Sequence, residues 1–315
     1  MILALQKKYI NEPIQTIYFG GGTPSLLKND LFDKIVHQIH NIFTVAPVIE
    51  FTIEANPDDI SEEKLFFWKQ MGVNRLSIGV QSFQQQALEW MNRAHNAQQA
   101  LESIQLAKQY GFDNISIDLI YGTPTLSMQH LLDDLQIIAC LQISHVSCYA
   151  LTIEEKTALY HFIKENKMEN VDAHIQEAHF NLIVEKLNSL GYIHYEISNF
   201  AKPNMQSQHN SNYWNGIHYI GIGPSAHSYN TVSRQWNVAN NALYIQSLEN
   251  DIIPYEIEKL TTDNQYNEFI MVGLRKLEGI NLEVLDKKFG SKYLSHTFQI
   301  LEAKKELLEI KNKNV

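Results

Sequence analysis

Cysteine is scarce in this chain of 315 residues, which has only Cys140 and Cys148. Two cysteines cannot build a disulfide framework. Cys140 lies in an apolar helical stretch and Cys148 in a strand-like one, without the spacing of metal ligands. We expect both to be small buried residues.

Basic stretches and long apolar runs are also missing. The formal net charge is −10, and no cluster of Lys and Arg offsets it, which argues against a nucleic-acid or anionic-membrane binder. No apolar run reaches transmembrane length, and the first residues form no signal-peptide pattern. They predict a short amphipathic helix within Met1–Ile10. We therefore expect a cytoplasmic location.

Short apolar strands that alternate with helices dominate the first half of the chain. The strands are expected at Ile14–Phe19, Val48–Glu54, Arg75–Val80, Ile115–Ile120 and His145–Leu151, with helices at 29–43, 61–71, 84–91, 97–110 and 128–139. This alternation predicts a parallel sheet, either open or curled into a barrel. A hydrophobic content of 44% is enough for one barrel-sized domain and an appendage.

The carboxyl ends of these strands are polar or glycine-rich. In chain order they carry Gly20–Thr23, Glu54 with Asn56, Gln81 with Ser82, Asp118, and Tyr149 with Ala150. The glycine run alone also suits a tight strand-to-helix turn, and it is not the dinucleotide GxGxxG. A single acid such as Glu54 or Asp118 could be structural. The first four of these ends together favour a ligand site, because ligands gather there in parallel α/β folds.

The second half has a different pattern. A helix is expected at 173–190, a strand at 192–200, and two or three short helices in 261–315, which resemble a winged-helix tail or a core-capping appendage. Between them, 208–229 combines three histidines with several aromatic residues in a loop-like context. A surface loop with hydrogen-bonded histidines explains this segment as well as a porphyrin site does, in which imidazole and aromatic faces suit a haem.

Seven motifs together resemble the HemW family of radical-SAM proteins, which are related to the oxygen-independent coproporphyrinogen III oxidases. They are GGGTPSLL, EANPDD, GVQSF, NRAH, DLIYGTP, YALTIE and HNSNYW, and the resemblance runs from about Leu5 to Leu285. It implies an α/β fold: an incomplete parallel (β/α) barrel lacking its first strand, with a small C-terminal helical, winged-helix-like extension. The implied domains are a partial barrel (1–160), a part that completes the barrel and carries the HNxxYW haem-associated segment (161–258), and an incomplete helical domain (259–315).

The resemblance also implies roles for single residues. Gly21, Gly22 and Thr23 match the segment that meets the amino group of S-adenosylmethionine (SAM). The positions that hold its ribose, carboxylate and adenine correspond to Glu54, Gln81, Arg93 and Asp118, with a backbone contact from Ala150 and an approach from His227. His209, in HNSNYW, is the candidate axial ligand of haem.

One family feature is missing from the sequence. Radical-SAM chemistry uses a [4Fe–4S] cluster held by three cysteines in a CxxxCxxC loop, because soft thiolates suit this iron. That loop and the strand before it are absent, and Cys140 and Cys148 cannot replace it. We expect no cluster and no reductive cleavage of SAM in this chain, which we interpret as a fragment of a longer reading frame. Strand Ile14–Phe19 would then be an uncovered edge and favour aggregation.

Three functions compete on this basis. The first is a haem chaperone that binds haem and delivers it to acceptor apoproteins, with a peripheral membrane contact only through those partners. The second is an enzyme, an oxygen-independent coproporphyrinogen III oxidase that decarboxylates propionates through SAM radicals. The third is a relic that binds neither ligand. HNSNYW favours the chaperone, and whether the chain is an enzyme stays open.

Overall fold

The computed structural model describes residues 12–308 and residue 314. The helix expected within Met1–Ile10 lies outside these residues. Contacts divide the chain into two compact units, each described here by itself. The sheet unit contains Gln15–Val36 and Val48–Ser207, and the second unit contains residues 12–14, His37–Pro47 and 208–308 of the described chain. The expected division at residues 160 and 258 stays a prediction.

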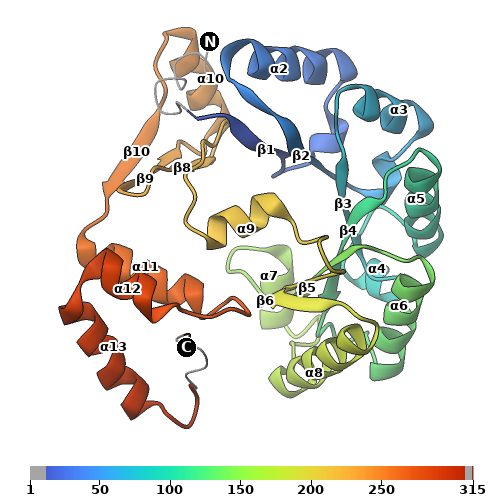
Figure 1. The fold of residues 1–315 in the computed structure, drawn as a ribbon. Coiled ribbons are helices and arrows are strands. Elements are labelled where there is room, and N and C mark those ends of the chain that lie inside the picture. Colours follow the sequence, from blue (N-terminus) through green and yellow to red (C-terminus); the bar gives the residue numbers. More distant parts are fainter. Residues whose placement is uncertain (1–11, 309–313, 315) are drawn as a thin grey trace. The chain divides into compact units, whose positions relative to one another are not determined.

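A seven-stranded, largely parallel sheet forms the first unit (Figure 1). Its order is β1 (Ile14–Phe19), β2 (Val45–Ala55), β3 (Arg75–Gln81), β4 (Asn114–Tyr121), β5 (His145–Ala150), β7 (Asn199–Ala201) and β6 (Ile193–Glu196). Strands β2 to β5 pair in parallel, as the alternation predicts. The single strand expected over 192–200 is instead the antiparallel pair β6 and β7, because the chain reverses at Ile197–Ser198.

Helices α3, α5, α6 and α8 line one side of this curved sheet (Figure 1). The helices of this part are η2 (Pro24–Leu26), α2 (Asn29–Ile42), η3 (Pro57–Asp59), α3 (Glu62–Gln70), α4 (Gln85–Trp90), α5 (Ala97–Gln109), α6 (Met128–Cys140), α7 (Ala158–Lys164) and α8 (Ala173–Ser189). Ser61 caps α3, and its side chain accepts a hydrogen bond from the Lys64 amide. The core between sheet and helices includes fully buried Trp68, Phe51 and Ile104.

The two cysteines differ in their surroundings. Cys148 is buried in β5, as expected. Cys140 is exposed, so the expectation of burial was wrong for this residue. It is the last residue of α6, and the buried stripe of that helix runs through Leu131, Leu135 and Ile138 instead.

The second unit carries a three-stranded antiparallel sheet and several helices. Its elements are α9 (Gln208–Trp214), β8 (His227–Tyr229), β9 (Ser233–Asn237), α10 (Asn241–Glu249), β10 (Tyr255–Lys259), α11 (Thr262–Gly273), α12 (Leu282–Phe289) and α13 (Ser291–Ala303). The last three match the short helices expected in the tail, and Tyr266, Ile280 and Leu285 form their core. The segment from residue 208 was expected to be loop-like. This prediction was wrong for its first residues, because 208–214 form the helix α9. Within residues 12–308, no helix combines the length and apolarity needed to cross a membrane.

Candidate functional site

The glycine run after β1 is held by Glu54 at the end of β2. The Gly21 amide donates to Glu54 Oε2 over 2.9 Å, and the Tyr18 hydroxyl donates to Glu54 Oε1 over 2.6 Å. Gly21 and Gly22 have φ angles of 77° and 65°, where glycine is strongly favoured, and a Cβ on either would meet nothing within 4 Å. The loop therefore presents open backbone, followed by Thr23 at the start of η2.

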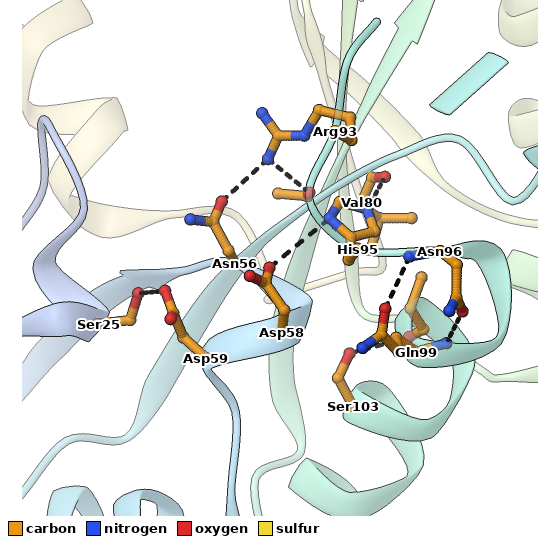
Figure 2. Close-up of polar contacts among 12 residues, drawn as sticks. Ser25, Asn56, Asp58, Asp59, Val80, Arg93, His95, Asn96, Gln99 and Ser103 are labelled. Carbon is orange, nitrogen blue, oxygen red and sulfur yellow. Dashed lines mark hydrogen bonds and ion pairs between the residues drawn. The ribbon is translucent and has the colours of Figure 1, made fainter. Parts of the chain in front are cut away.

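A second group of polar atoms surrounds Gly79 in β3. Arg93 Nη2 donates to Asn56 Oδ1 over 2.9 Å and lies 3.5 Å from the Gly79 carbonyl oxygen (Figure 2). A Cβ on Gly79 would lie 3.0 Å from Gln81 Nε2 and 3.6 Å from Arg93 Nη2. The Nε of Arg93 is buried and has no hydrogen-bond partner among the described residues. Such a buried donor is ready to meet an acceptor on a ligand, such as a carboxylate.

The EANPDD and NRAH motifs contact each other here. Besides the Asn56–Arg93 bond, His95 Nδ1 lies 3.9 Å from Asp58 Oδ1, and His95 Nε2 lies 3.0 Å from the Val80 carbonyl oxygen (Figure 2). Burial lowers the pKa of His95, which favours the neutral ring with its proton on Nε2. Ser25 Oγ donates to Asp59 Oδ2 over 2.6 Å, which ties the loop after β1 to the same motif.

Asp118 and Ala150 complete the row of strand ends. Asp118 pairs in register with Ser147, and Ala150 pairs with Tyr121 at the last step of β4 and β5. Burial raises the pKa of Asp118 to about 6; a hydrogen bond from Ser147 opposes the rise, and the charge of Glu54 adds to it. The carboxyl group thus changes charge close to physiological pH.

Several polar residues of this sheet were missed in the sequence analysis, and not all of them lie at the carboxyl ends, since His145 begins β5. Tyr18 is one. A buried chain is another, in which Ser116 Oγ lies 2.7 Å from His145 Nδ1 and His145 Nε2 lies 2.7 Å from the Tyr195 hydroxyl. The sequence could have indicated them, because side chains two positions apart in a strand lie on the same face of the sheet. Ser116 is two positions before Asp118, and His145 is two positions before Ser147.

The candidate haem ligand lies on α9 in the second unit. His209 Nε2 is 3.0 Å from the Tyr213 hydroxyl, and the two rings meet edge to face. Tyr213 in turn contacts Tyr219 edge to face, with ring centroids 4.6 Å apart. Arg275 lies over the Trp214 ring at 5.6 Å. An imidazole among aromatic rings, with a nearby cation for a propionate, fits a haem.

The other two histidines of this segment have separate surroundings. His218 Nε2 lies 3.2 Å from Glu12 Oε2. His227 is exposed on β8, and its ring centroid is 6.2 Å from that of Trp236. Because His227 belongs to the second unit and Glu54 to the sheet unit, its approach to the strand-end ligand stays a prediction.

A [4Fe–4S] cluster does not fit the residues of this chain. Its two cysteines are one exposed thiol at a helix end and one buried thiol in a strand. Burial and the nearby Asp118 raise the pKa of the Cys148 thiol, which opposes the thiolate that iron needs. In the part of the chain that the structure describes, no three His, Cys, Asp or Glu side chains gather as metal ligands do.

The seven-stranded, largely parallel sheet and the sequence comparison together place this chain in the radical SAM class. The sequence pattern of the radical SAM superfamily matches residues 1–138. A solved structure of coproporphyrinogen III oxidase (HemN) from Escherichia coli, 20% identical, superposes with a TM-score of 0.81 over 99% of this chain and 77% of its own. At that identity the likeness shows the fold alone.

Sequence relatives narrow the class to a family. The heme chaperone HemW of Bacillus subtilis is 36% identical over 297 residues, which cover 91% of this chain and 78% of the relative. That of Lactococcus lactis is 34% identical, covering 88% of this chain and 73% of the relative. The chain belongs to the HemW family.

Proposed function

We propose that this protein is a haem chaperone, which binds haem and passes it to acceptor apoproteins in the cytoplasm. The observation that carries the proposal is α9, where the HNSNYW segment sets the His209 imidazole edge to face with Tyr213, whose ring contacts Tyr219. Relatives named heme chaperones across most of the chain support it. Contact with a membrane would come only through the acceptors.

Haem would be held by three kinds of group in the second unit. His209 would supply the axial nitrogen to iron. The rings of Tyr213 and Tyr219 would contact the porphyrin plane. Arg275, and Lys276, which now donates to Asn215 over 3.2 Å, would pair with the two propionates. Each group would bind haem by an interaction typical of its side chain: the imidazole with iron, the aromatic rings with the porphyrin, and the cations with the carboxylates.

SAM would occupy the strand ends of the sheet unit. Open backbone at Gly21 and Gly22, the buried Nε of Arg93 and the carboxyl groups of Glu54 and Asp118 fit its amine, carboxylate and ribose. Bound there, SAM would act as a ligand of the chaperone. No radical step is assigned to this chain, because its cysteines do not fit the cluster.

The oxidase alternative lacks a supporting observation in this chain. The oxidase would need the cluster to cleave SAM, and HNSNYW points to the chaperone. Incubation with coproporphyrinogen III, SAM and a reductant should therefore give no decarboxylated product. Product formation would contradict the chaperone proposal.

The direct test is a haem titration of the unaltered chain and of His209→Ala. We expect the Soret band of the bound haem to shift in the variant and the affinity for haem to fall by about tenfold or more. The reason is that the remaining apolar contacts do not compensate for the lost axial bond to iron. His218→Ala is the matched control, because it removes a histidine of the same segment that pairs with Glu12. Transfer to apomyoglobin, followed by absorbance, tests delivery. An unchanged spectrum and affinity in His209→Ala would refute the assignment.

A further inference from the structure

The backbone at the end of β3 turns through a strained residue. Gln81 has a φ of 67°, which is uncommon for a residue with a side chain. The Ser82 amide donates to the Val80 carbonyl over 2.9 Å, which closes a three-residue turn with Gln81 at its centre. The pairing of β3 with β4 also shifts register between Ile78 and Gln81. Such strain persists only where the surrounding structure holds it.

The carboxyl group of Asp134, on α6, supplies that support. Asp134 Oδ2 accepts from Ser82 Oγ over 2.7 Å. Asp134 Oδ1 accepts from the Phe83 amide over 3.2 Å and from Gln84 Nε2 over 2.7 Å. The side chain is buried, with an exposed fraction of 1%. One acid from a distant helix thus receives donors from the three residues that follow Gln81.

The turn decides where the Gln81 amide lies. Gln81 Nε2 is close enough to Gly79 that a Cβ there would be 3.0 Å away, and Arg93 Nη2 is on the same side. In an ordinary extended strand, residues 79 and 81 would also share a face but would be separated along the strand by nearly 7 Å, or roughly two residues. The turn brings the amide back over Gly79, beside the Arg93 guanidinium.

We propose that Asp134 is a positioning residue for the strand-end site, which fixes the Gln81 turn and thereby places the Gln81 amide beside Arg93 for the ligand. The inference rests on the proposed binding of SAM at these strand ends. Asp134 is buried and its carboxylate is engaged by the three residues after Gln81, so it would act through Gln81.

The test is a set of S-adenosylhomocysteine titrations by calorimetry on the full chain. Asp134→Ala removes all three hydrogen bonds, and we expect binding to weaken by about tenfold. Asp134→Asn keeps the Oδ1 acceptor for Phe83 and Gln84, so it should recover most of the affinity. Asp133→Ala is the matched control, because Asp133 is the next acid on α6, is exposed, and accepts a hydrogen bond from Gln129 on the same helix. It should bind as the unaltered chain does.

A second arm separates positioning from general stability. In a Gln81→Ala background, Asp134→Ala should cause no further loss, because Asp134 acts through the side chain already removed. Additive losses would overturn the inference. The inference would also be overturned if Asp134→Ala bound S-adenosylhomocysteine with unchanged affinity while Gln81→Ala bound it more weakly. In that case the proposed ligand site at the strand ends would still stand.

Other outcomes also have defined meanings. If the unaltered chain binds no S-adenosylhomocysteine, the SAM proposal fails and this inference fails with it. If Gln81→Ala binds normally, the role of Gln81 and this inference fail, while the SAM proposal stands. If Asp134→Ala does not fold, Ser82→Ala, which removes the donor to Asp134 Oδ2, is compared with and without Gln81→Ala in the same way. Haem titration of each variant checks that the second unit is intact.

Discussion

Replacing Asp118 by asparagine should change how the stability of the sheet unit depends on pH. The pKa of Asp118 is about 6 in the folded protein, against about 3.9 in an unfolded chain. The folded state therefore binds the proton more tightly. As pH rises from about 4 to about 6, the buried carboxylate becomes charged and this acid's contribution to the free energy of unfolding falls.

The size of the effect follows from the difference in pKa. About 2 units at about 1.4 kcal/mol each give about 3 kcal/mol. The asparagine side chain of the variant carries no charge at any of these pH values. The variant should therefore gain about 3 kcal/mol relative to the unaltered chain between about pH 4 and about pH 7, whatever constant offset the substitution introduces.

Amide hydrogen exchange of β4, followed by mass spectrometry across the same pH range, measures this difference within the sheet unit. Carbon-13 NMR of the Asp118 carboxyl group gives its pKa directly. Asp133→Asn is the control, because it makes the same substitution at an exposed acid on α6. A pKa of about 4, the value of an unperturbed acid, or a variant whose relative stability falls with pH, would refute the reasoning.

Two other substitutions test the local geometry. Gly79→Ala places a methyl group 3.0 Å from Gln81 Nε2 and 3.6 Å from Arg93 Nη2. We expect S-adenosylhomocysteine binding to weaken by about tenfold, and the stability to change by less than about 1 kcal/mol because flexible side-chain ends can move. Normal binding would contradict this crowding. Asn96→Ala removes the capping box with Gln99 at the start of α5; it should cost about 1 kcal/mol of stability by thermal unfolding, and no loss would mean that the cap contributes little.

The sequence was sufficient for the parallel strands because their apolar runs are short and bounded by turn residues. β3 to β5 lie within one or two residues of the expected ranges, and β2 extends three residues earlier. Helix α9 was missed because HNSNYW has no apolar period of 3.6 and is followed by Gly216. The hairpin of β6 and β7 was missed for a related reason: its reversal uses Ile197 and Ser198, which give no Gly or Pro turn signal.

The residues of the candidate site could be named from the sequence, but their arrangement in space could not be predicted. Gly21, Glu54, Gln81, Arg93 and Asp118 were named from strand ends and from family resemblance. The bond between Asn56 and Arg93 spans 37 positions, and the contacts of Asp134 with Ser82, Phe83 and Gln84 span about 50. Such pairs depend on how α6 and the loops pack against the sheet, which no local pattern encodes.

These contacts also explain why each motif contains more residues than those proposed to bind the ligand. Asp59 holds Ser25, and His95 faces Asp58 and the Val80 carbonyl, so these motif residues are engaged within the protein. Their effect is to tie the loops after β1, β2 and β3 to one another. Under the proposed binding of SAM, the groups left for the ligand would be fewer, chiefly Gln81 and the buried Nε of Arg93. A variant such as Asp58→Ala should therefore weaken binding only as far as it loosens Arg93, whereas Arg93→Ala would remove the proposed contact itself.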